Sequence, residues 1–317
     1  MQQLQGGRPT EGIPAATAVA IGMFDGVHLG HQALIRRTMA IGQEQGLTPL
    51  VLTFDRHADE ILRPDRARPY LTTLSEKVAA IKALGVAHVV VARVTPSFLA
   101  IKARDFVTRY LRGELHARAV VVGPDFRFGQ GRQGDVALLT AMQRECRYKL
   151  EVLPPVLLDG EPVSSTLIRR TLSAGDVRRA AVLMGHPYQL TGEVTHGEEV
   201  GRTLGFPTAN LVYPPQKILP ALGVYLCRAR TADACYGAAV NVGRRPTFDG
   251  TRITVEAHLL DFAGDLYGQK LTLEFLERLR AEQKFASAAD LRAQITADVE
   301  HARQAFARHE SEHTHEP

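Results

Sequence analysis

The sequence predicts an α/β domain built on a parallel sheet, followed by an antiparallel β-barrel or sandwich that ends in a helix. Three observations support this expectation. The chain has 317 residues, whereas one domain usually holds ~100 to 200. Apolar strand-like runs alternate with helix-like segments in the first half, and strand-like segments follow one another from Tyr188 onward. We therefore expect two domains of different architecture.

The first half contains short apolar runs separated by stretches of helical periodicity. Strands are predicted at residues 19–21, 49–54, 87–94 and 119–122, and helices at 76–84, 104–112 and 135–145, with another beginning near Leu34. Strands that are apolar along their whole length and alternate with helices indicate a parallel sheet covered on both faces.

The second half shows no helical periodicity until its end. Strands are predicted at residues 188–194, 223–230, 236–242, 253–262 and 271–279, with turns between them, which is typical of an antiparallel barrel or sandwich. Ser287 and Asp290 have the spacing of a capping box, and apolar residues then recur at helical spacing up to Phe306. The chain should therefore end in a helix packed on the barrel.

Four segments are expected along the chain: a polar leader at 1–18, the α/β domain at 19–185, the β domain at 186–308 and a disordered tail at 309–317. The boundary is placed where a short helix ends at Gly185 and Pro187 forbids its continuation.

Composition excludes several classes of protein. The 38 Lys and Arg exceed the 34 Asp and Glu only slightly and are scattered, so no nucleic-acid partner is expected. The 3 cysteines form no C-x-x-C pair, which argues against a disulfide framework and favours a reducing cytoplasm. No apolar run reaches the ~18 residues of a membrane span.

The first candidate site is GMFDGVHLGH at 22–31, between the first strand and the first helix. Unpaired amides at a helix N-terminus suit phosphate, and Gly26 and Gly30 let the backbone approach a ligand. His28 and His31 could hydrogen-bond phosphate oxygens as charge develops. A zinc site or two surface histidines without a role are the alternatives.

Two further clusters in the first domain could bind anions. The glycine-rich loop 123–134 offers Arg127 and Arg132, although a plain flexible loop is equally consistent with it. The segment VSSTLIRR at 163–170 places hydroxyls at a helix start, one turn before Arg169. Those hydroxyls could simply cap the helix, or could complete a triphosphate clamp with the guanidinium.

The second domain offers a loop and a strand with polar side chains. The glycine-punctuated segment 196–210 holds Thr208 and Asn210, whose oxygens are donors that magnesium accepts together with nucleotide phosphates. No Walker motif occurs, which excludes an ordinary P-loop kinase. Glu256 shares one strand face with Thr254 and His258, and is either a solvated carboxylate or a general base.

These motifs together resemble the prokaryotic riboflavin kinase and FMN adenylyltransferase family. The resemblance covers residues 19–299 and rests on the conjunction of G-x-F-D-G-V-H-x-G-H, G-x-D-F-x-F-G, S-S-T-x-I-R, L-G-F-P-T-A-N, G-x-x-P-T-F and V-E-x-H-L-L-D-F. It implies a nucleotidyltransferase-like, Rossmann-type first domain and a six-stranded antiparallel flavokinase barrel with a C-terminal helix. It also implies two reactions: ATP phosphorylates riboflavin to FMN, and ATP then adenylates FMN to FAD.

The resemblance assigns roles residue by residue. His28, His31, Asn210 and Glu256 would be catalytic, and Thr208 and Asn210 would hold Mg²⁺ with ATP. ATP would contact Gly22, Phe24, Asp25, Gly26, His28, His31, Asp125, Ser165, Thr166 and Arg169 in the first domain, and Gly201, Arg202, Thr208 and Asn210 in the second. Flavin would contact Phe54, His57, Phe126, Phe128, Phe206 and Glu256.

Three places depart from the family pattern. Residues 55–58 lack two prolines that the family often has, Leu167 replaces a common arginine, and Arg245 replaces a common asparagine. Two other functions are kept as alternatives. One is a monofunctional nucleotidyltransferase whose second domain only binds flavin, and the other is a flavin-responsive regulatory protein without catalysis.

Overall fold

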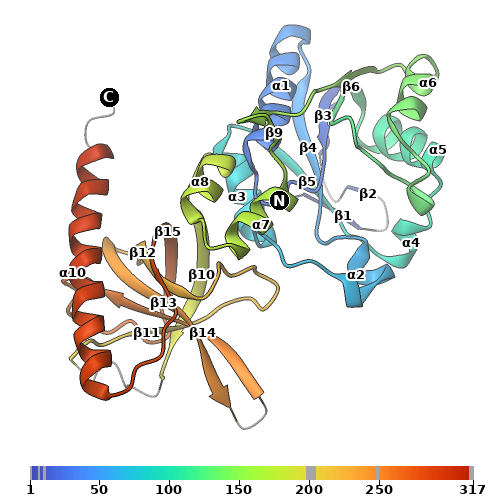
Figure 1. The fold of residues 1–317 in the computed structure, drawn as a ribbon. Coiled ribbons are helices and arrows are strands. Elements are labelled where there is room, and N and C mark those ends of the chain that lie inside the picture. The colour runs from blue at the N-terminus through green and yellow to red at the C-terminus, as the bar shows by residue number, and fades with distance from the viewer. Residues whose placement is uncertain (1, 6–7, 10–11, 198–204, 248–249, 314–317) are drawn as a thin grey trace. The chain divides into compact units, whose positions relative to one another are not determined.

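The computed structural model describes residues 2–5, 8–9, 12–197, 205–247 and 250–313. The chain forms two compact units, Met1–Ser165 and Thr166–Pro317. Each unit has its own core and is described by itself (Figure 1).

The first unit is built on a seven-stranded sheet in the order β2-β1-β5-β4-β3-β6-β7. Every neighbouring pair is parallel except β1 and β2, which are antiparallel. The strands are β1 (Gln2–Gln5), β2 (Arg8–Pro9), β3 (Thr17–Ile21), β4 (Thr48–Phe54), β5 (His88–Ala92), β6 (Ala117–Val122) and β7 (Lys149–Val152). The predicted parallel sheet is confirmed.

Helices cover both faces of this sheet (Figure 1). Alternate strand residues pack against α1 (Leu29–Gln45) and α3 (Leu74–Ala83) on one face. The other face packs against η2 (Phe106–Glu114), which is π-helical, and α6 (Val136–Cys146). Short elements connect these layers: α2 (Asp59–Leu62), η1 (Pro64–Arg66), α4 (Pro96–Leu99), α5 (Ala103–Asp105), η3 (Gln130–Arg132), β8 (Leu157–Leu158) and β9 (Glu161–Pro162).

The second unit is a closed barrel in the order β10-β11-β14-β13-β12-β15 with all pairs antiparallel. Its strands are β10 (Tyr188–Thr195), β11 (Ala209–Val212), β12 (Gly223–Arg230), β13 (Cys235–Thr247), β14 (Gly250–Leu259) and β15 (Lys270–Ala281). Side chains alternate, so that Tyr225 and Phe275 fill the interior while Leu226 and Leu276 face the helix α10 (Ala288–His313). The six-stranded barrel with its C-terminal helix is confirmed.

The ends of the predicted segments differ from the structure. Residues 2–5, expected to be part of a polar leader, form strand β1 because their backbone pairs with β5. Helix α10 continues to His313, past the predicted start of a tail at 309, and the Glu310 carboxylate accepts a hydrogen bond from Arg228 Nη2 on β12 at 2.8 Å. The ends of the chain therefore contain more regular structure than their composition indicates.

Two helices precede the barrel and belong almost entirely to the second unit. Helices α7 (Ser165–Ser173) and α8 (Val177–Met184) lie before β10, and α8 contacts β10 and β15. The amide of Ala221 donates to the Leu172 carbonyl at 3.0 Å. The compact units thus divide at Ser165, whereas the boundary after Gly185 stays a prediction.

Candidate active sites

The sheet of the first unit brings three predicted motifs to one edge. Strand β3 lies between β4 and β6, and the strand order changes direction there. Ligands of such sheets bind beyond the carboxyl ends of the strands at this reversal. The phosphate-loop candidate follows β3, Phe54 ends β4, and the glycine-rich loop follows β6.

The loop after β3 is held by a buried carboxylate. Asp25 is 1% exposed and accepts hydrogen bonds from the amides of Leu71 and Thr72 at 3.0 and 3.1 Å. Gly26 has φ +85°, and a Cβ there would lie 2.7 Å from Leu71 Cδ1. Since Asp25 and the fully buried Phe24 face inward, these two residues shape the loop, and their predicted contact with ATP would involve their backbone.

The two histidines begin helix α1. His28 is its N-cap, and its Nδ1 accepts a hydrogen bond from the His31 amide at 3.4 Å. The two rings stack with centroids 3.6 Å apart. Burial, followed by the charges of His28 and Lys77, holds the pKa of His31 well below its usual value. His31 Nδ1 is buried and has no hydrogen-bond partner among the described residues, so a bound ligand could supply one.

The zinc alternative finds no support in the described part of the chain. There, no group of three or more His, Cys, Asp or Glu side chains is placed to hold a metal ion. A structural zinc site needs four protein ligands. Contact of the histidine pair with phosphate stays a prediction.

The S-S-T-x-I-R motif is divided between the two units. Ser165 belongs to the first unit, and its Oγ donates to the Asp25 carbonyl at 2.9 Å, so it contacts the phosphate-loop candidate directly. Thr166 and Arg169 belong to the second unit, and so does Leu167. Their approach to the histidines stays a prediction.

Three predicted flavin residues of the first unit, Phe54, Phe126 and Phe128, join one aromatic cluster. Phe126 and Phe128 stack with centroids 5.4 Å apart, and Phe128 contacts Phe106 at 5.3 Å. Phe98 lies 6.1 Å from Phe54 and 6.5 Å from Phe106, which connects the ends of β4 and β6. Phe54 and Phe126 are partly exposed, so both can contact a planar ligand, whereas Asp125 is exposed on a turn.

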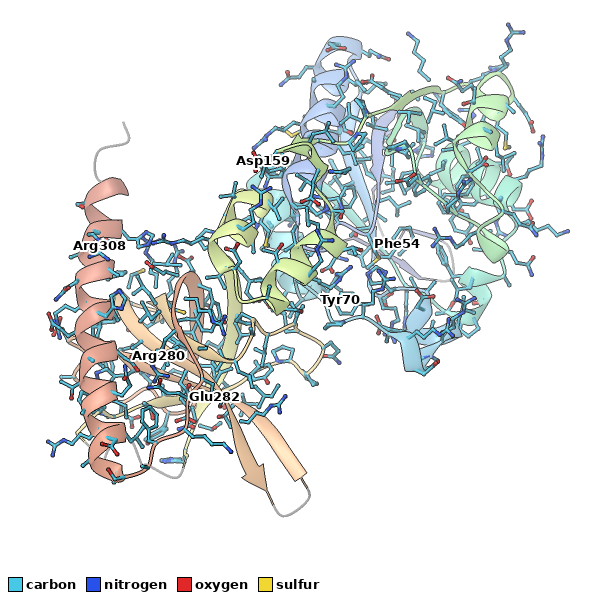
Figure 2. All side chains as sticks on the ribbon, in the orientation of Figure 1. Phe54, Tyr70, Asp159, Arg280, Glu282 and Arg308 are labelled. Carbon is cyan, nitrogen blue, oxygen red and sulfur yellow. The ribbon has the colours of Figure 1, made fainter. Side chains whose placement is uncertain are left out.

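The loop at 55–58 is fixed by hydrogen bonds where the family often has prolines. Asp55 Oδ1 accepts from the Val94 amide at 2.8 Å, and the His57 amide donates to the Tyr70 hydroxyl at 2.7 Å. The His57 and Tyr70 rings also stack at 5.4 Å. Phe54 and Tyr70 mark this part of the first unit in Figure 2. The loss of the prolines therefore leaves this loop anchored at both ends.

The barrel places the candidate kinase residues side by side. Glu256 on β14 is the register partner of Asn210 on β11 and of Asn241 on β13. Directly opposed residues of antiparallel strands have Cβ atoms about 4.5–5.5 Å apart. Glu256 Oε1 also accepts a hydrogen bond from Thr254 Oγ1 at 3.1 Å. The carboxylate thus lies between two amides.

Phe206 lies next to the face of β14 that carries Glu256 and His258. Its ring meets His258 edge-on at 5.7 Å, and His258 Nδ1 lies 2.8 Å from the Pro207 carbonyl. His258 and Glu256 share a face of β14, so the segment that carries Thr208 approaches that face. Gly201 and Arg202 lie outside the described residues, and so does the side chain of Arg245.

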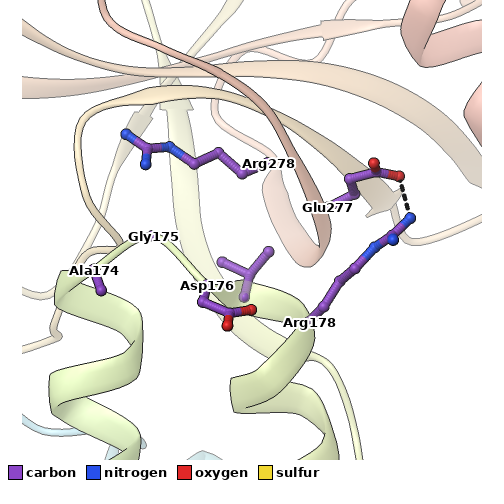
Figure 3. Close-up of a pocket in the computed structure, with 7 residues that line it drawn as sticks. Ala174, Gly175, Asp176, Arg178, Glu277 and Arg278 are labelled. Carbon is purple, nitrogen blue, oxygen red and sulfur yellow. Dashed lines mark hydrogen bonds and ion pairs between the residues drawn. The ribbon is translucent and has the colours of Figure 1, made fainter.

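A separate cavity of about 370 Å³ lies elsewhere on the second unit (Figure 3). The turn between α7 and α8 and strand β15 line it, and Arg178 and Glu277 form an ion pair of 2.6 Å at its edge. Strand β15 is not a neighbour of β14 in the barrel. This cavity therefore does not contain Glu256.

Sequence reasoning missed two residues of these sites. Asn241 lies opposite Glu256, and strand alternation within residues 236–242 could have placed it on the polar face. Lys77 is 3% exposed beneath the loop after β3. The sequence did contain a signal for its burial. Lys77 lies one helical turn before the buried Ile81 and therefore on the same face of α3.

Each unit of the chain matches a known protein family. The FAD synthetase family matches residues 11–167, and the riboflavin kinase family matches residues 184–306. The bifunctional riboflavin kinase/FMN adenylyltransferase of Escherichia coli strain K12 is 37% identical over 91% of this chain and 92% of its own length. That of Haemophilus influenzae is 36% identical over 96% of this chain and 99% of its own.

One solved structure covers both units. It is described as a macrolide-efflux protein from Streptococcus pneumoniae, and it has a TM-score of 0.84 and 32% identity over 93% of this chain and 96% of that chain. In the described part of the present chain, no helix has the length and apolar character needed to cross a membrane.

A nucleotide-binding sheet domain joined to a flavokinase barrel defines a two-domain transferase that acts on flavins. The chain belongs to the family of bifunctional riboflavin kinase/FMN adenylyltransferases. Its substrates are riboflavin, FMN and ATP, and its two activities yield FMN and FAD. The monofunctional and regulatory alternatives are therefore set aside.

Proposed function

We propose that adenylyl transfer takes place at His28 and His31, and that phosphoryl transfer takes place at Glu256. The observation that best supports the first assignment is the buried His31 Nδ1 without a partner, at the N-terminus of α1. The register of Asn210 and Glu256 supports the second.

In the adenylyl-transfer reaction, a phosphate oxygen of FMN attacks the α-phosphorus of ATP and pyrophosphate leaves. The new P–O bond replaces the bond from the α-phosphorus to the bridging oxygen, so no protein nucleophile is required. The two imidazoles and the first amides of α1 donate hydrogen bonds to the leaving phosphates. Phe54 and Phe126 hold the isoalloxazine ring at the ends of β4 and β6.

In the kinase reaction, the 5′-hydroxyl of the ribityl chain attacks the γ-phosphorus of ATP and ADP leaves. Glu256 accepts the hydroxyl proton, and Thr254 orients the carboxylate through its hydrogen bond of 3.1 Å. Positioning contributes most of the acceleration in such transfers. The Asn210 amide lies opposite Glu256 and positions the phosphates of ATP.

Thr208 and Asn210 fit a magnesium ion that arrives with ATP. Both side chains are partly exposed, they are two residues apart in an extended segment, and they supply a hydroxyl and an amide oxygen. Mg²⁺ commonly keeps few protein ligands and takes phosphate oxygens instead. The ion would neutralise charge on the phosphates. A cytoplasmic location stays a prediction; the free thiols of Cys146, Cys227 and Cys235 support it.

The experiment is chromatography of the products formed from riboflavin, ATP and magnesium. The wild type should yield FMN and FAD, and H28A should stop at FMN. E256Q should make no FMN but should still convert supplied FMN to FAD. The exposed residues His301 and Glu193 provide matched controls as H301A and E193Q, which should match the wild type. Full kinase activity in E256Q would refute the assignment of the base.

A further inference from the structure

A buried lysine connects the two loops of the adenylyl-transfer site. Lys77 lies on α3 and is only 3% exposed. Its Nζ donates to the Met23 carbonyl at 3.0 Å and to the Phe54 carbonyl at 2.7 Å. Met23 belongs to the loop that leads to the histidines, and Phe54 is the last residue of β4. One ammonium group therefore holds both sides of the site.

These carbonyl contacts alone do not require a charge. The Met23 carbonyl also accepts a hydrogen bond from the neutral hydroxyl of Thr53 at 3.1 Å. Placing an ammonium group in the interior is unfavourable unless its charge is compensated. The compensating charges are the carboxylates Asp25 and Asp55, one after β3 and one after β4. A positive charge maintained at this cost points to a role beyond packing.

The charge of Lys77 acts on His31. Burial lowers the pKa of Lys77 to about 8, against the opposing effect of Asp25 and Asp55, so the ammonium form prevails at neutral pH. Burial, then the charge of His28, and then this positive charge lower the pKa of His31. A lowered pKa favours the neutral form of the His31 imidazole.

We infer that Lys77 is a positioning residue for FAD formation, which fixes the spacing between the phosphate loop at Met23 and the end of β4 at Phe54. This inference rests on the proposed adenylyl-transfer site at His28 and His31. Lys77 itself touches neither substrate. It acts through its hydrogen bonds to the Met23 and Phe54 carbonyls and through the electrostatic effect of its charge on His31.

The test compares K77M with K82M, because Lys82 lies on the same helix and is exposed. FAD formation from supplied FMN and ATP should fall tenfold or more in K77M and should stay unchanged in K82M. FMN formation by the barrel of the same chain serves as an internal standard and should be equal in both. If K77M keeps FAD formation within twofold of K82M, the inference is wrong.

Two measurements separate positioning from simple loss of folding. In the wild type, FAD formation should decline as the pH rises through about 8, where Lys77 loses its proton, whereas FMN formation should not. K77R should move this decline to higher pH, since its guanidinium stays charged. A wild-type FAD profile that remains flat through pH 9 would overturn the inference even if K77M did not fold.

The His31 ring reports on the charge directly. The pKa of its imidazole, measured by NMR titration, should be higher in K77M than in K82M, because the repulsion from the Lys77 charge is gone.

The H28A variant distinguishes the proposed adenylyl-transfer site from the proposed role of Lys77. If H28A still forms FAD, the site assignment fails. If H28A is inactive while Lys77 variants change neither the pH profile nor the His31 pKa, only the present inference fails.

Discussion

The imidazole rings of His28 and His31 stack with centroids 3.6 Å apart and planes 20° from parallel. A protonated ring beside another ring of the same kind is disfavoured, so the pair resists taking up two protons. The pKa of His31 is lowered accordingly, with burial as the largest cause.

The first unit should lose stability in mild acid through His31. A histidine whose folded-state pKa lies below its unfolded value of about 6.5 makes the unfolded state bind more protons below that pH. The free energy of unfolding should therefore fall as the pH drops below about 6.5, by at most about 1.4 kcal/mol per pH unit. Urea unfolding at pH 7.0 and pH 5.5 tests this. H31N should reduce the loss, and H301N on α10 should leave it unchanged.

The turn at Gly26 should tolerate no side chain. G26A combines a positive φ with a Cβ 2.7 Å from Leu71 Cδ1. The strain and the overlap together should cost about 2–3 kcal/mol and slow FAD formation. Gly46 has φ +63° and open space around its Cα, so G46A should cost about 1 kcal/mol and leave FAD formation intact. Equal losses of stability in the two variants would show that the contact with Leu71 is unimportant.

The hydrogen bond from Thr254 to Glu256 should matter for turnover rather than for binding. T254V keeps the shape of the side chain and removes the donor. We expect the kcat of FMN formation to fall about tenfold, or 1.4 kcal/mol, with little change in KM. Thr191 pairs with Thr272 on β10 and β15 at 2.9 Å, and T191V should be neutral for the kinase. A change in KM alone would mean that Thr254 serves substrate binding.

The C-terminal helix should depend on one ion pair. Arg280 Nε and Nη2 donate to both oxygens of Asp298 at 2.7–3.0 Å, and Asp298 is 7% exposed. R280M should cost the barrel about 2–3 kcal/mol, because it leaves a buried carboxylate without its cation. Arg303 and Asp261 form an exposed pair, so R303M should cost less than about 1 kcal/mol. The stabilities of R280M and R303M can be compared by urea unfolding monitored with circular dichroism.

Much of the fold could be predicted because apolar periodicity follows directly from burial. The runs at 49–54 and 119–122 correspond to β4 and β6, and the capping pattern at Ser287 is confirmed by the Asp290 amide, which donates to the Ser287 hydroxyl at 3.1 Å. Motifs that follow parallel strands must meet at one edge of the sheet. The phosphate loop, Phe54 and the loop at 123–134 all meet this condition, although the sequence joined them in one site only through the family resemblance.

Other features could not be predicted from periodicity alone. Strand β1 (Gln2–Gln5) forms through backbone hydrogen bonds to β5, which any side chains permit. Strand β7 (Lys149–Val152) is short and follows α6 almost directly, so its few apolar residues do not stand out. The spacing of Lys77 from Ile81 indicates the buried face of α3, but the carbonyls that bind its ammonium group come from segments distant in the chain. Such contacts follow from tertiary structure and cannot be found in a local window.

The closure of the barrel affects how flavin production would respond to heat. Strand β10 pairs with both β11 and β15, so the second unit completes its own hydrogen bonding and buries its own core. If heat unfolded the first unit while the closed barrel stayed folded, the chain would go on making FMN from riboflavin but would make no FAD.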